Sequence, residues 1–396
     1  MIRMGVIGYG NRANQVVRLV ERLDAGARIA AIADPAQDAV KKRLAAEKFI
    51  KDKIEDIHFY PDADKMLAKE KDLSGVFVAT RCSLHTTMAC KVAKTGLPLY
   101  LEKPVATTMD DLKKLKAAFA KSKSPVVVSF PLRLSQLVEV PRRLIAEGEI
   151  GTLEQVQAIN NVPYGSGYYR NWYRDYNETG GLWLQKATHD LDYINHIVGE
   201  LPVLITALES RRVFGGRKPA GLTCDVCEEL ETCPESPYAD FFPRLNAEQY
   251  TPQPRKCVFG KDIDPRYSDN GSALIEYANG LHACYSQCFF VSGTAGERGA
   301  TLIGYKGSIS FDWYTGKVKV IKHHRGRTDT LDFGGVDGHG GGDEELVRDF
   351  IGLMRGKGTS RAPISAGILS AYLCLKARES AQTHTVQRLS LKELEK

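Results

Sequence analysis

The sequence lacks several features that would assign it to particular classes of protein. No apolar run approaches the roughly 18 residues that a membrane-spanning helix needs. The start, "MIRMGVIGYG", lacks the charged segment, long apolar stretch and cleavage site of a secretory signal. The 54 lysines and arginines are scattered among 48 acidic residues, so the net charge of +6 is weak support for a nucleic-acid partner. We expect a cytoplasmic protein with no membrane or nucleic-acid partner.

The length and composition of the chain suit two globular domains. Its 396 residues are too many for one ordinary domain, and 43% apolar with 26% charged residues is typical of a globular protein. We expect a first domain over residues 1–128 and a second over 129–396. An insertion at about residues 215–260 is expected to interrupt the second domain.

A glycine-rich turn follows the first apolar segment. The stretch "GYGNRA" (residues 8–13) fits the spacing G-x-G-x-x-G/A and is followed by a helical pattern. In such a turn Gly8 allows a tight bend, Gly10 lets a pyrophosphate approach the backbone, and Ala13 lets helix and strand pack closely. The helix start would then offer free N–H groups to the phosphates. The turn therefore predicts a dinucleotide site.

An acidic residue follows the next expected strand. "RIAAIADP" (residues 28–35) ends in Asp34, whose carboxylate can accept hydrogen bonds from a ribose and repels a 2′-phosphate. This favours NAD over NADP as the cofactor. The alternative is a glycine turn of another α/β protein, with Asp34 as a helix cap.

Further strands alternate with helices along the first domain. Apolar strands are expected at residues 73–80, 98–108 and 125–130, with helical patterns between them. This alternation predicts a parallel, doubly wound sheet that binds its ligand at the carboxyl ends of the strands. The predicted cofactor-binding residues are Gly8, Gly10, Asn11, Arg12, Ala13, Asp34, Thr80, His85, Glu102 and Lys103.

The pattern changes after about residue 129. Several segments alternate apolar and polar residues, and Asn279-Gly280 is typical of a turn between two strands. We expect an α+β domain with a large, mostly antiparallel open sheet and helices on one face.

Six segments together resemble a known family. They are "GVIGYGNRA", "VFVATRCSLH", "LEKPVATT", "RRLIAEGEIGTLEQV", "KATHDLDYINHIVG" and "GHGGGDEELVRDF". They resemble the Gfo/Idh/MocA family, which includes glucose–fructose oxidoreductase, inositol dehydrogenase and rhizopine-catabolism proteins. The resemblance implies a Rossmann domain, NAD(P)-dependent oxidoreductase activity, and a homodimer or homotetramer formed through the free face of the second sheet.

The catalytic residues are expected in the stretch "GGLWLQKATHDLDYINH" (residues 180–196). On a helix, Gln185, His189 and Asp192 would share one face, with Lys186 within reach of His189. The family resemblance implies that His189 exchanges the substrate hydroxyl proton. The family's aspartate, four residues before this histidine, is replaced here by Gln185. An amide can orient the histidine but cannot titrate, so either His189 acts unassisted or Lys186 takes part of the role.

Lys103 is the other expected catalytic residue. It lies in the Glu-Lys-Pro segment that follows an apolar strand. An ammonium group there would stabilise a developing alkoxide, and desolvation beside a nicotinamide would lower its pKa. The alternative is a surface lysine before a proline turn.

The segment at residues 162–181 is rich in tyrosine and contains two arginines. Aromatic faces and guanidinium groups suit a sugar ring, so we expect this loop to cover the substrate, with an oligomer contact as the alternative. His339 lies in a glycine-rich entrance to a later helix, where the family brings groups to the substrate. The predicted substrate-binding residues are Tyr169, Arg170, Trp172, Arg174, Asp192 and His339.

Four cysteines are grouped in the expected insertion. Cys224, Cys227, Cys233 and Cys257 could supply four thiolates to a structural zinc ion, with an iron–sulfur cluster or free thiols as alternatives. The insertion resembles one in a family subgroup that has cysteines here. A closed four-thiolate site would be structural, because it leaves no position for a substrate.

We therefore expect an NAD-dependent oxidoreductase that takes hydride from a secondary hydroxyl of a sugar, glycoside or polyol. One alternative is a redox-neutral glycosidase, which oxidises a sugar with bound NAD, eliminates the substituent, adds water and reduces again. Another is an NAD-binding regulator without turnover.

Overall fold

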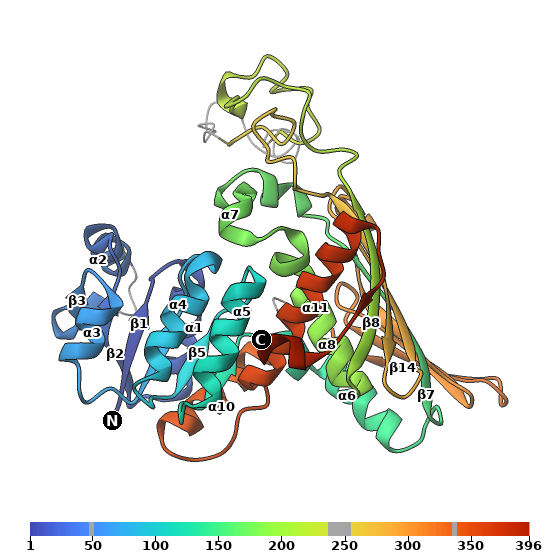
Figure 1. Cartoon of the computed structure of the whole chain (residues 1–396), viewed down its shortest axis with the longest axis horizontal. Coiled ribbons are helices and arrows are strands. Elements are labelled where there is room, and N and C mark those ends of the chain that lie inside the picture. Colours follow the sequence, from blue (N-terminus) through green and yellow to red (C-terminus); the bar gives the residue numbers. More distant parts are fainter. Residues whose placement is uncertain (47–50, 237–254, 335–338, 396) are drawn as a thin grey trace.

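The chain folds around two β-sheets with helices between and beside them (Figure 1). This computed structural model describes residues 1–46, 51–236, 255–334 and 339–395, with residues 51–53 described by their backbone alone. Residues 237–254 of the expected insertion lie outside the described residues. No helix in the described ranges has the length and apolarity needed to cross a bilayer.

The first sheet has six parallel strands in the order β3-β2-β1-β4-β5-β6. The prediction of a parallel, doubly wound sheet is confirmed, because this is the strand order of a dinucleotide-binding fold. The strands are β1 Ile2–Ile7, β2 Ala27–Ala33, β3 His58–Tyr60, β4 Gly75–Val78, β5 Leu99–Leu101 and β6 Val126–Val128. The helices are α1 Asn11–Leu23, α2 Gln37–Ala46, α3 Ala63–Lys69, α4 His85–Ala93 and α5 Met109–Ala120.

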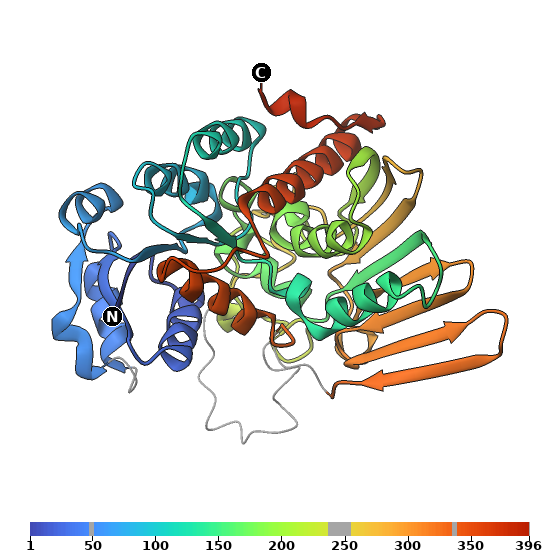
Figure 2. The same cartoon turned by 90° about the horizontal axis from the view of Figure 1, so that it is seen from below.

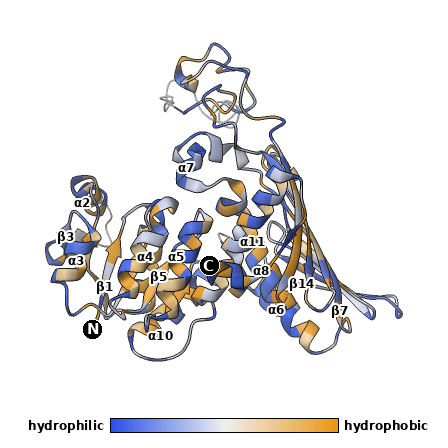
Figure 3. Ribbon diagram, viewed as in Figure 1, coloured by the Kyte–Doolittle hydropathy of each residue, from blue (hydrophilic) through white to orange (hydrophobic). Residues whose placement is uncertain are grey.

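The central strands of this sheet are buried on both faces. Every residue of β4 and β5 is buried, and so are most residues of β1 and β2. Continuous apolar runs such as "GVFV" suit this position, because helices cover both faces of a parallel sheet. Figure 3 shows the hydrophobic colouring of β1 and β5.

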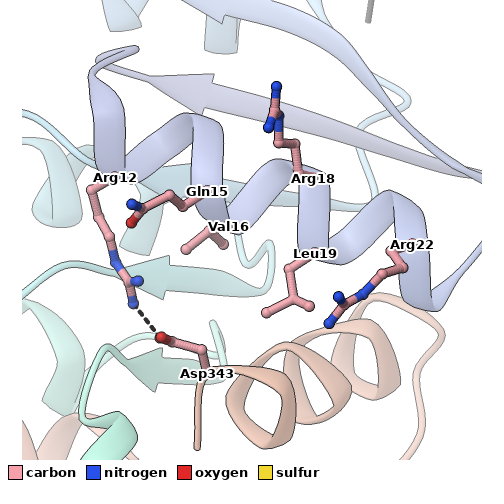
Figure 4. A pocket seen from close by; sticks show the side chains of 7 residues that line it. All are labelled: Arg12, Gln15, Val16, Arg18, Leu19, Arg22 and Asp343. Atoms are coloured by element: carbon pink, nitrogen blue, oxygen red, sulfur yellow. Dashed lines mark hydrogen bonds and ion pairs between the residues drawn. The ribbon is translucent and has the colours of Figure 1, made fainter. Parts of the chain in front are cut away.

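One helix from the C-terminal part of the chain packs on the first sheet. This helix, α10 (Gly342–Met354), lies alongside α1 (Figure 4). The ring of Phe350 meets that of Tyr100 edge-on, with 5.5 Å between their centroids. A Cβ atom on Gly75 would lie 2.7 Å from Cγ of Met354, so only glycine leaves room for that side chain. The region predicted as the second domain thus completes the packing of the first.

The second sheet has nine strands in the order β14-β13-β12-β11-β7-β10-β9-β8-β15. All neighbours are antiparallel except β7 and β10, which confirms the predicted open, mostly antiparallel sheet. The strands are β7 Leu153–Asn161, β8 Pro202–Ser210, β9 Asn270–Tyr277, β10 His282–Cys288, β11 Glu297–Gly304, β12 Gly307–Asp312, β13 Lys317–Lys322, β14 Arg327–Asp332 and β15 Gln387–Arg388.

One face of the second sheet is covered by helices. These are α6 Gln136–Ala146, α8 Thr188–Val198 and α11 Ile364–Thr383. Figure 2 shows them between the two sheets. Residues along β9 alternate strictly between exposed and buried, as expected for a strand with one covered face. The predicted turn at Asn279-Gly280 is present, and Gly280 has a φ of +87°.

The expected insertion extends beyond the rest of the molecule, above α7 (Tyr176–Thr179) in Figure 1. Its described parts pack on the tyrosine-rich segment that precedes α8. The buried residues of this second core cluster are Val162, Tyr169, Tyr176, Leu182, Phe214, Val258, Ile263, Tyr267 and Phe289.

Candidate active site

The predicted cofactor residues gather at one edge of the first sheet. Gly8 follows β1, Asp34 follows β2, Thr80 lies two residues after β4, and Glu102 with Lys103 follows β5. These four strands are neighbours in the sheet, so their carboxyl ends meet at the same edge.

The glycine-rich turn has the backbone that a pyrophosphate needs. Gly8 has a φ of +82°, and a Cβ atom there would lie 3.0 Å from the carbonyl oxygen of Ala79. A Cβ on Gly10 would meet no described atom within 4 Å, so the backbone there faces open space. Ala13 is fully buried against the strand. Among the described residues, no side chain caps α1 and no acid occupies its first turn, which leaves this helix end suited to an anion.

Asp34 fixes the glycine-rich turn as well as ending β2. Its Oδ2 accepts a hydrogen bond from the backbone N–H of Tyr9 (2.9 Å), and its Oδ1 accepts one from that of Ala36 (2.8 Å). The half-buried carboxylate keeps acceptor capacity for a ribose. The capping role and the cofactor role are therefore compatible.

Two of the residues predicted to bind cofactor are bound to the protein instead. The prediction for His85 is wrong, because its buried ring lies 2.8 Å from the carbonyl oxygen of Pro104 and 3.1 Å from that of Thr80. It joins the loops that follow β4 and β5. The guanidinium of Arg12 also differs from the prediction, because it serves carboxylates rather than phosphate.

Arg12 links the glycine-rich turn to two distant segments. Its Nε donates to Glu102 Oε1 (2.8 Å), and its Nη2 donates to Ser129 Oγ (3.0 Å) and Asp343 Oδ1 (2.5 Å). Figure 4 shows the bond to Asp343, which lies at the start of α10. A groove of about 240 Å³ lies between α1 and α10, and Figure 4 shows the side chains that line it. The groove lies beside the glycine-rich turn.

Lys103 points from the edge of the first sheet toward the segment before α8. Its Nζ donates to the backbone carbonyl of Gln185 over 2.7 Å. Burial lowers the pKa of Lys103 to about 8, and the nearby cations Lys186 and Arg12 act in the same direction. The prediction of a desolvated lysine at this edge agrees with this geometry.

The turn before α8 is wider than the sequence pattern predicts. Trp183–Ala187 form a π-helical turn, in which the N–H of Thr188 bonds to the carbonyl of Trp183. Such a turn breaks the four-residue spacing of an α-helix. The side chain of Gln185 therefore turns toward Cys82, whose thiol donates to Gln185 Oε1 over 3.3 Å. The oxygen of the Gln185 amide is thus bound to Cys82 rather than to the His189 ring.

His189 has almost no access to solvent and no carboxylate partner. It is 7% exposed, and its Nδ1 has no hydrogen-bond partner in the described part of the chain. Its ring lies edge-on to Phe130, with centroids 6.1 Å apart, and 6.0 Å from the ring of His339. Burial holds the pKa of His189 well below its usual range, and the charges of Lys103 and Arg298 add to this. His189 is therefore a neutral imidazole.

Lys186 is buried on the other side of this group. Its Nζ donates to the hydroxyl of Tyr164 over 2.5 Å and lies 4.8 Å from the centroid of that ring. Burial holds the pKa of Lys186 well below its usual range, with the charge of Arg298 acting in the same direction. Tyr164 is 53% exposed, so the pair joins the interior of the site to the surface. Sequence reasoning included Tyr164 only as part of the aromatic segment.

A buried ion pair anchors the residue next to His189. Asp190 Oδ1 accepts from Arg298 Nε (2.9 Å), while Oδ2 accepts from Asn160 Nδ2 (2.6 Å) and Tyr285 Oη (2.9 Å). These partners come from three strands of the second sheet, so they fix the start of α8 on that sheet. The acid beside His189 in "THD" was the one sequence signal for this contact.

Asp192 is bound to an arginine, which corrects its predicted place in the substrate site. Its carboxylate accepts two bonds from Arg133, at 2.9 Å from Nε and 2.5 Å from Nη2. Arg133 and Asp192 are only 6% and 2% exposed. The pair fastens α8 to the turn that follows the first sheet.

Three residues of the tyrosine-rich segment hold the insertion rather than cover a substrate. Tyr169 is fully buried and donates to the carbonyl of Ser268, while Arg170 pairs with Glu235 and Arg174 with Asp262. Their predicted substrate roles are therefore corrected.

Trp172 keeps a position consistent with substrate binding. Its ring is stacked on Tyr173 at 4.0 Å and lies 3.9 Å from the guanidinium carbon of Arg81, near the end of β4. The half-buried Trp172 thus stands by the carboxyl edge.

The four cysteines lie on adjoining segments without forming a metal site in the described residues. Thr223 pairs with Lys256, and the backbone N–H of Cys227 bonds to the carbonyl of Cys224. Burial raises the pKa of Cys224, and the thiols of Cys257, Cys233 and Cys227 raise it further, so the four are neighbours. None of the four is in a disulfide, and no described set of three or more Cys, His, Asp or Glu is placed to hold a metal. Zinc stays a prediction.

Comparison with known proteins identifies the family. Residues 2–130 match the model of the oxidoreductase family's NAD-binding Rossmann fold, and residues 142–389 match that of its C-terminal alpha/beta domain. The chain belongs to the Gfo/Idh/MocA oxidoreductase family. The predicted membership is thus confirmed.

Several family members are similar over much of the chain. YteT of Bacillus subtilis (strain 168), named an oxidoreductase, is 26% identical over 357 residues, which are 81% of each chain. The inositol 2-dehydrogenase of Rhizobium meliloti (strain 1021) is 25% identical over 52% of this chain and 58% of its own. A levoglucosan dehydrogenase, solved with NADH and levoglucosan, superposes with a TM-score of 0.73 over 98% of this chain and 99% of its own, at 19% identity. At this identity, the similarity to levoglucosan dehydrogenase shows a shared fold and nothing more.

Proposed function

We propose that this family member is an NAD-dependent oxidoreductase acting on a secondary hydroxyl of a sugar, glycoside or polyol. The observation that carries the proposal is the meeting of Lys103 and the segment of His189 at the edge where the glycine-rich turn lies. A lysine with a lowered pKa and a neutral histidine beside a dinucleotide site suit the oxidation of an alcohol.

Lys103 and His189 would have different roles in the reaction. Bound NAD would supply the hydride acceptor. The ammonium of Lys103 would donate to the substrate oxygen and stabilise the negative charge that develops there. The neutral imidazole of His189 would accept the hydroxyl proton. Both side chains are shielded from bulk water, which strengthens these interactions.

Asp34 supports NAD as the preferred cofactor. Its carboxylate at the end of β2 has acceptors for ribose hydroxyls, and its charge would repel a 2′-phosphate. To bind the 2′-phosphate of NADP, the site would need a positively charged group that replaces or neutralises this carboxylate.

The names of the relatives support a sugar or polyol substrate, because they include inositol 2-dehydrogenase and levoglucosan dehydrogenase. The exposed aromatic ring of Tyr164 and the half-buried ring of Trp172 would suit the apolar face of such a ring. A homodimer or homotetramer would cover the exposed Leu208 and Leu274 on neighbouring strands of the second sheet.

The test is NADH formation from a panel of sugars, glycosides and polyols. We expect Lys103→Met and His189→Asn to lose more than about a hundredfold in kcat while binding NAD normally. Lys91→Met and His196→Asn are matched controls, because those residues pair with Asp64 and Glu139 away from the site. Loss of turnover only in the first pair supports the assignment, and unchanged turnover in that pair refutes it.

Redox-neutral glycoside cleavage is the second candidate, and the orientation of Gln185 favours it. Position 185 is an amide and its side chain is bound to Cys82, so it offers His189 no carboxylate to stabilise a protonated form during net oxidation. A relative from Escherichia coli (strain K12), 25% identical over 54% of this chain, is named 2,7-anhydro-N-acetylneuraminate hydratase. Cleavage of an aryl thioglycoside without added NAD would establish this candidate, whereas NADH release from a free polyol would favour net oxidation.

A further inference from the structure

Among the described residues, His189 is poorly placed to keep the proton that it would accept from the substrate hydroxyl. His189 is buried, its Nδ1 has no hydrogen-bond partner among the described residues, and the charges of Lys103, Arg298, His339 and Lys186 all lower its pKa. An imidazolium at this position would be opposed by both desolvation and repulsion. The side chain of Gln185 is bound to Cys82. A proton accepted by His189 would therefore pass on readily to a neighbouring group.

His339 lies next to His189 and has the carboxylate that His189 lacks. The two ring centroids are 6.0 Å apart and the ring planes are tilted by 37°, so the two imidazoles are close neighbours. His339 Nδ1 lies 2.7 Å from Asp343 Oδ2, which leaves Nε2 for proton exchange. The side chain of His339 is 33% exposed, so it also reaches solvent.

Asp343 is held in place and in its charged form. Its other oxygen accepts a bond from Arg12, which is also bound to Glu102 and Ser129. Although burial opposes its ionisation, the hydrogen bond from His339 and the charge of Arg12 hold the pKa of Asp343 well below its usual range. The pair thus resembles the carboxylate–histidine arrangement by which many enzymes stabilise an imidazolium.

The charged and titratable groups that contact His339 or Asp343 among the described residues come from three helices. Asp343 lies on α10, Arg12 on α1 behind Asp343, and His189 on α8. Lys103 and Lys186 lower the pKa of His189. Among these described groups, Asp343 is the carboxylate in contact with His339.

We propose that His339, supported by Asp343, is the acid–base residue that receives the substrate proton through His189 and passes it to water. This inference rests on the proposed alcohol oxidation. The substrate hydroxyl loses its proton to His189 as the carbon loses hydride to NAD, so a C=O bond forms. The same proton moves to His339 Nε2 and then to solvent. Alcohol and NAD+ thus become carbonyl, NADH and one released proton.

The test compares Asp343→Asn, Asp343→Glu and His339→Gln with a control on the same helix. Asp349 lies on α10 and pairs with Arg361, so Asp349→Asn breaks an ion pair of this helix and leaves the contacts of His339 unchanged. We expect Asp343→Asn and His339→Gln to lower kcat by about tenfold to a hundredfold, with little change in KM. In Asp343→Asn the acid limb of the pH profile should move to lower pH, because the imidazolium loses its counter-charge. Asp343→Glu should recover part of the loss.

Several results would overturn the proposal. One is an Asp343→Asn enzyme with the turnover and acid limb of the wild type. Another is a loss equal in Asp349→Asn, which would indicate a general effect of disturbing α10. A third is a variant in which only the KM for NAD rises, which would show that Arg12 and Asp343 support cofactor binding rather than proton transfer.

A direct titration separates this inference from the proposed function. The Cε1–H resonance of His339, assigned with His339→Gln, can be followed from pH 5 to 9 by NMR without any substrate. A midpoint that moves to lower pH in Asp343→Asn but not in Asp349→Asn supports the pair even if no sugar is oxidised. An unmoved midpoint overturns it even if oxidation is found.

Discussion

The buried pair of Arg133 and Asp192 allows a quantitative test of one structural correction. Asp192→Asn keeps the shape of the side chain and removes its charge. The guanidinium of Arg133 then stays buried with the carbonyl of Arg361, at 2.8 Å, and a neutral amide as partners. Removing one member of a buried ion pair costs about 3–5 kcal/mol, because the other charge is left uncompensated. That is a large share of the roughly 5–15 kcal/mol that stabilises a typical fold.

The assay is urea unfolding followed by tryptophan fluorescence and circular dichroism. We expect the midpoint for Asp192→Asn to fall by roughly 1–3 M, given usual denaturant slopes. The double variant Arg133→Met/Asp192→Leu should recover most of the loss, because an apolar pair removes both charges together. Asp64→Asn breaks the exposed pair with Lys91 and should cost less than about 1 kcal/mol.

The sequence pattern had placed Asp192 in the substrate site, so the two interpretations predict different results. If Asp192→Asn unfolds like the wild type but raises the KM for the substrate tenfold or more, the structural role is refuted. A loss of stability with an unchanged KM supports it.

Three further predictions concern the cofactor edge and the cysteines. Because the pKa of Lys103 is about 8, its ammonium form is lost as the pH rises, so kcat/KM for oxidation should fall through about pH 8. The Lys103→Arg variant should lack this fall. A fall in kcat/KM near pH 10 in the wild type would contradict the assignment. Asp34→Ala should weaken NAD binding about tenfold (~1.4 kcal/mol) and narrow the preference over NADP; an unchanged ratio of the two affinities would contradict the ribose contact. If the four cysteines bind zinc, the purified protein should contain one equivalent that is lost in Cys224→Ser/Cys227→Ser; metal-free protein would show that they are free thiols.

The first sheet could be predicted because its signals are local. The spacing of Gly8, Gly10 and Ala13 defines the turn, and short apolar runs define the buried strands. The carboxyl ends of neighbouring strands must meet, so the places of Asp34 and Lys103 followed from the fold.

The residues around His189 could be predicted only in part. The helical spacing that placed Gln185 beside His189 assumes a regular α-helix, and the π-helical turn at Trp183–Ala187 breaks it. Nothing in the local pattern marks this turn. Arg133, which binds Asp192, is 59 residues away in sequence, so no spacing rule connects them.

The tyrosine-rich segment and the pair of His339 and Asp343 also show contacts that local sequence patterns could not predict. Aromatic and arginine side chains suit a sugar or a protein surface equally, and here the partners of Arg170 and Arg174 come from the insertion. His339 and Asp343 are only four residues apart, but His339 precedes the start of α10, so helical spacing did not connect them. The bond of Asp343 to Arg12 spans 331 residues and required the fold.

The most direct test of the proposed hydride transfer uses substrates labelled with deuterium at the carbinol carbons. The protein would be incubated with NAD and each labelled sugar or polyol, and the dinucleotide analysed by mass spectrometry. The account predicts that at least one substrate yields NADH one mass unit heavier, with the transfer lost in Lys103→Met and kept in Lys91→Met. Binding of NAD without transfer of deuterium from any sugar, glycoside or polyol would contradict it.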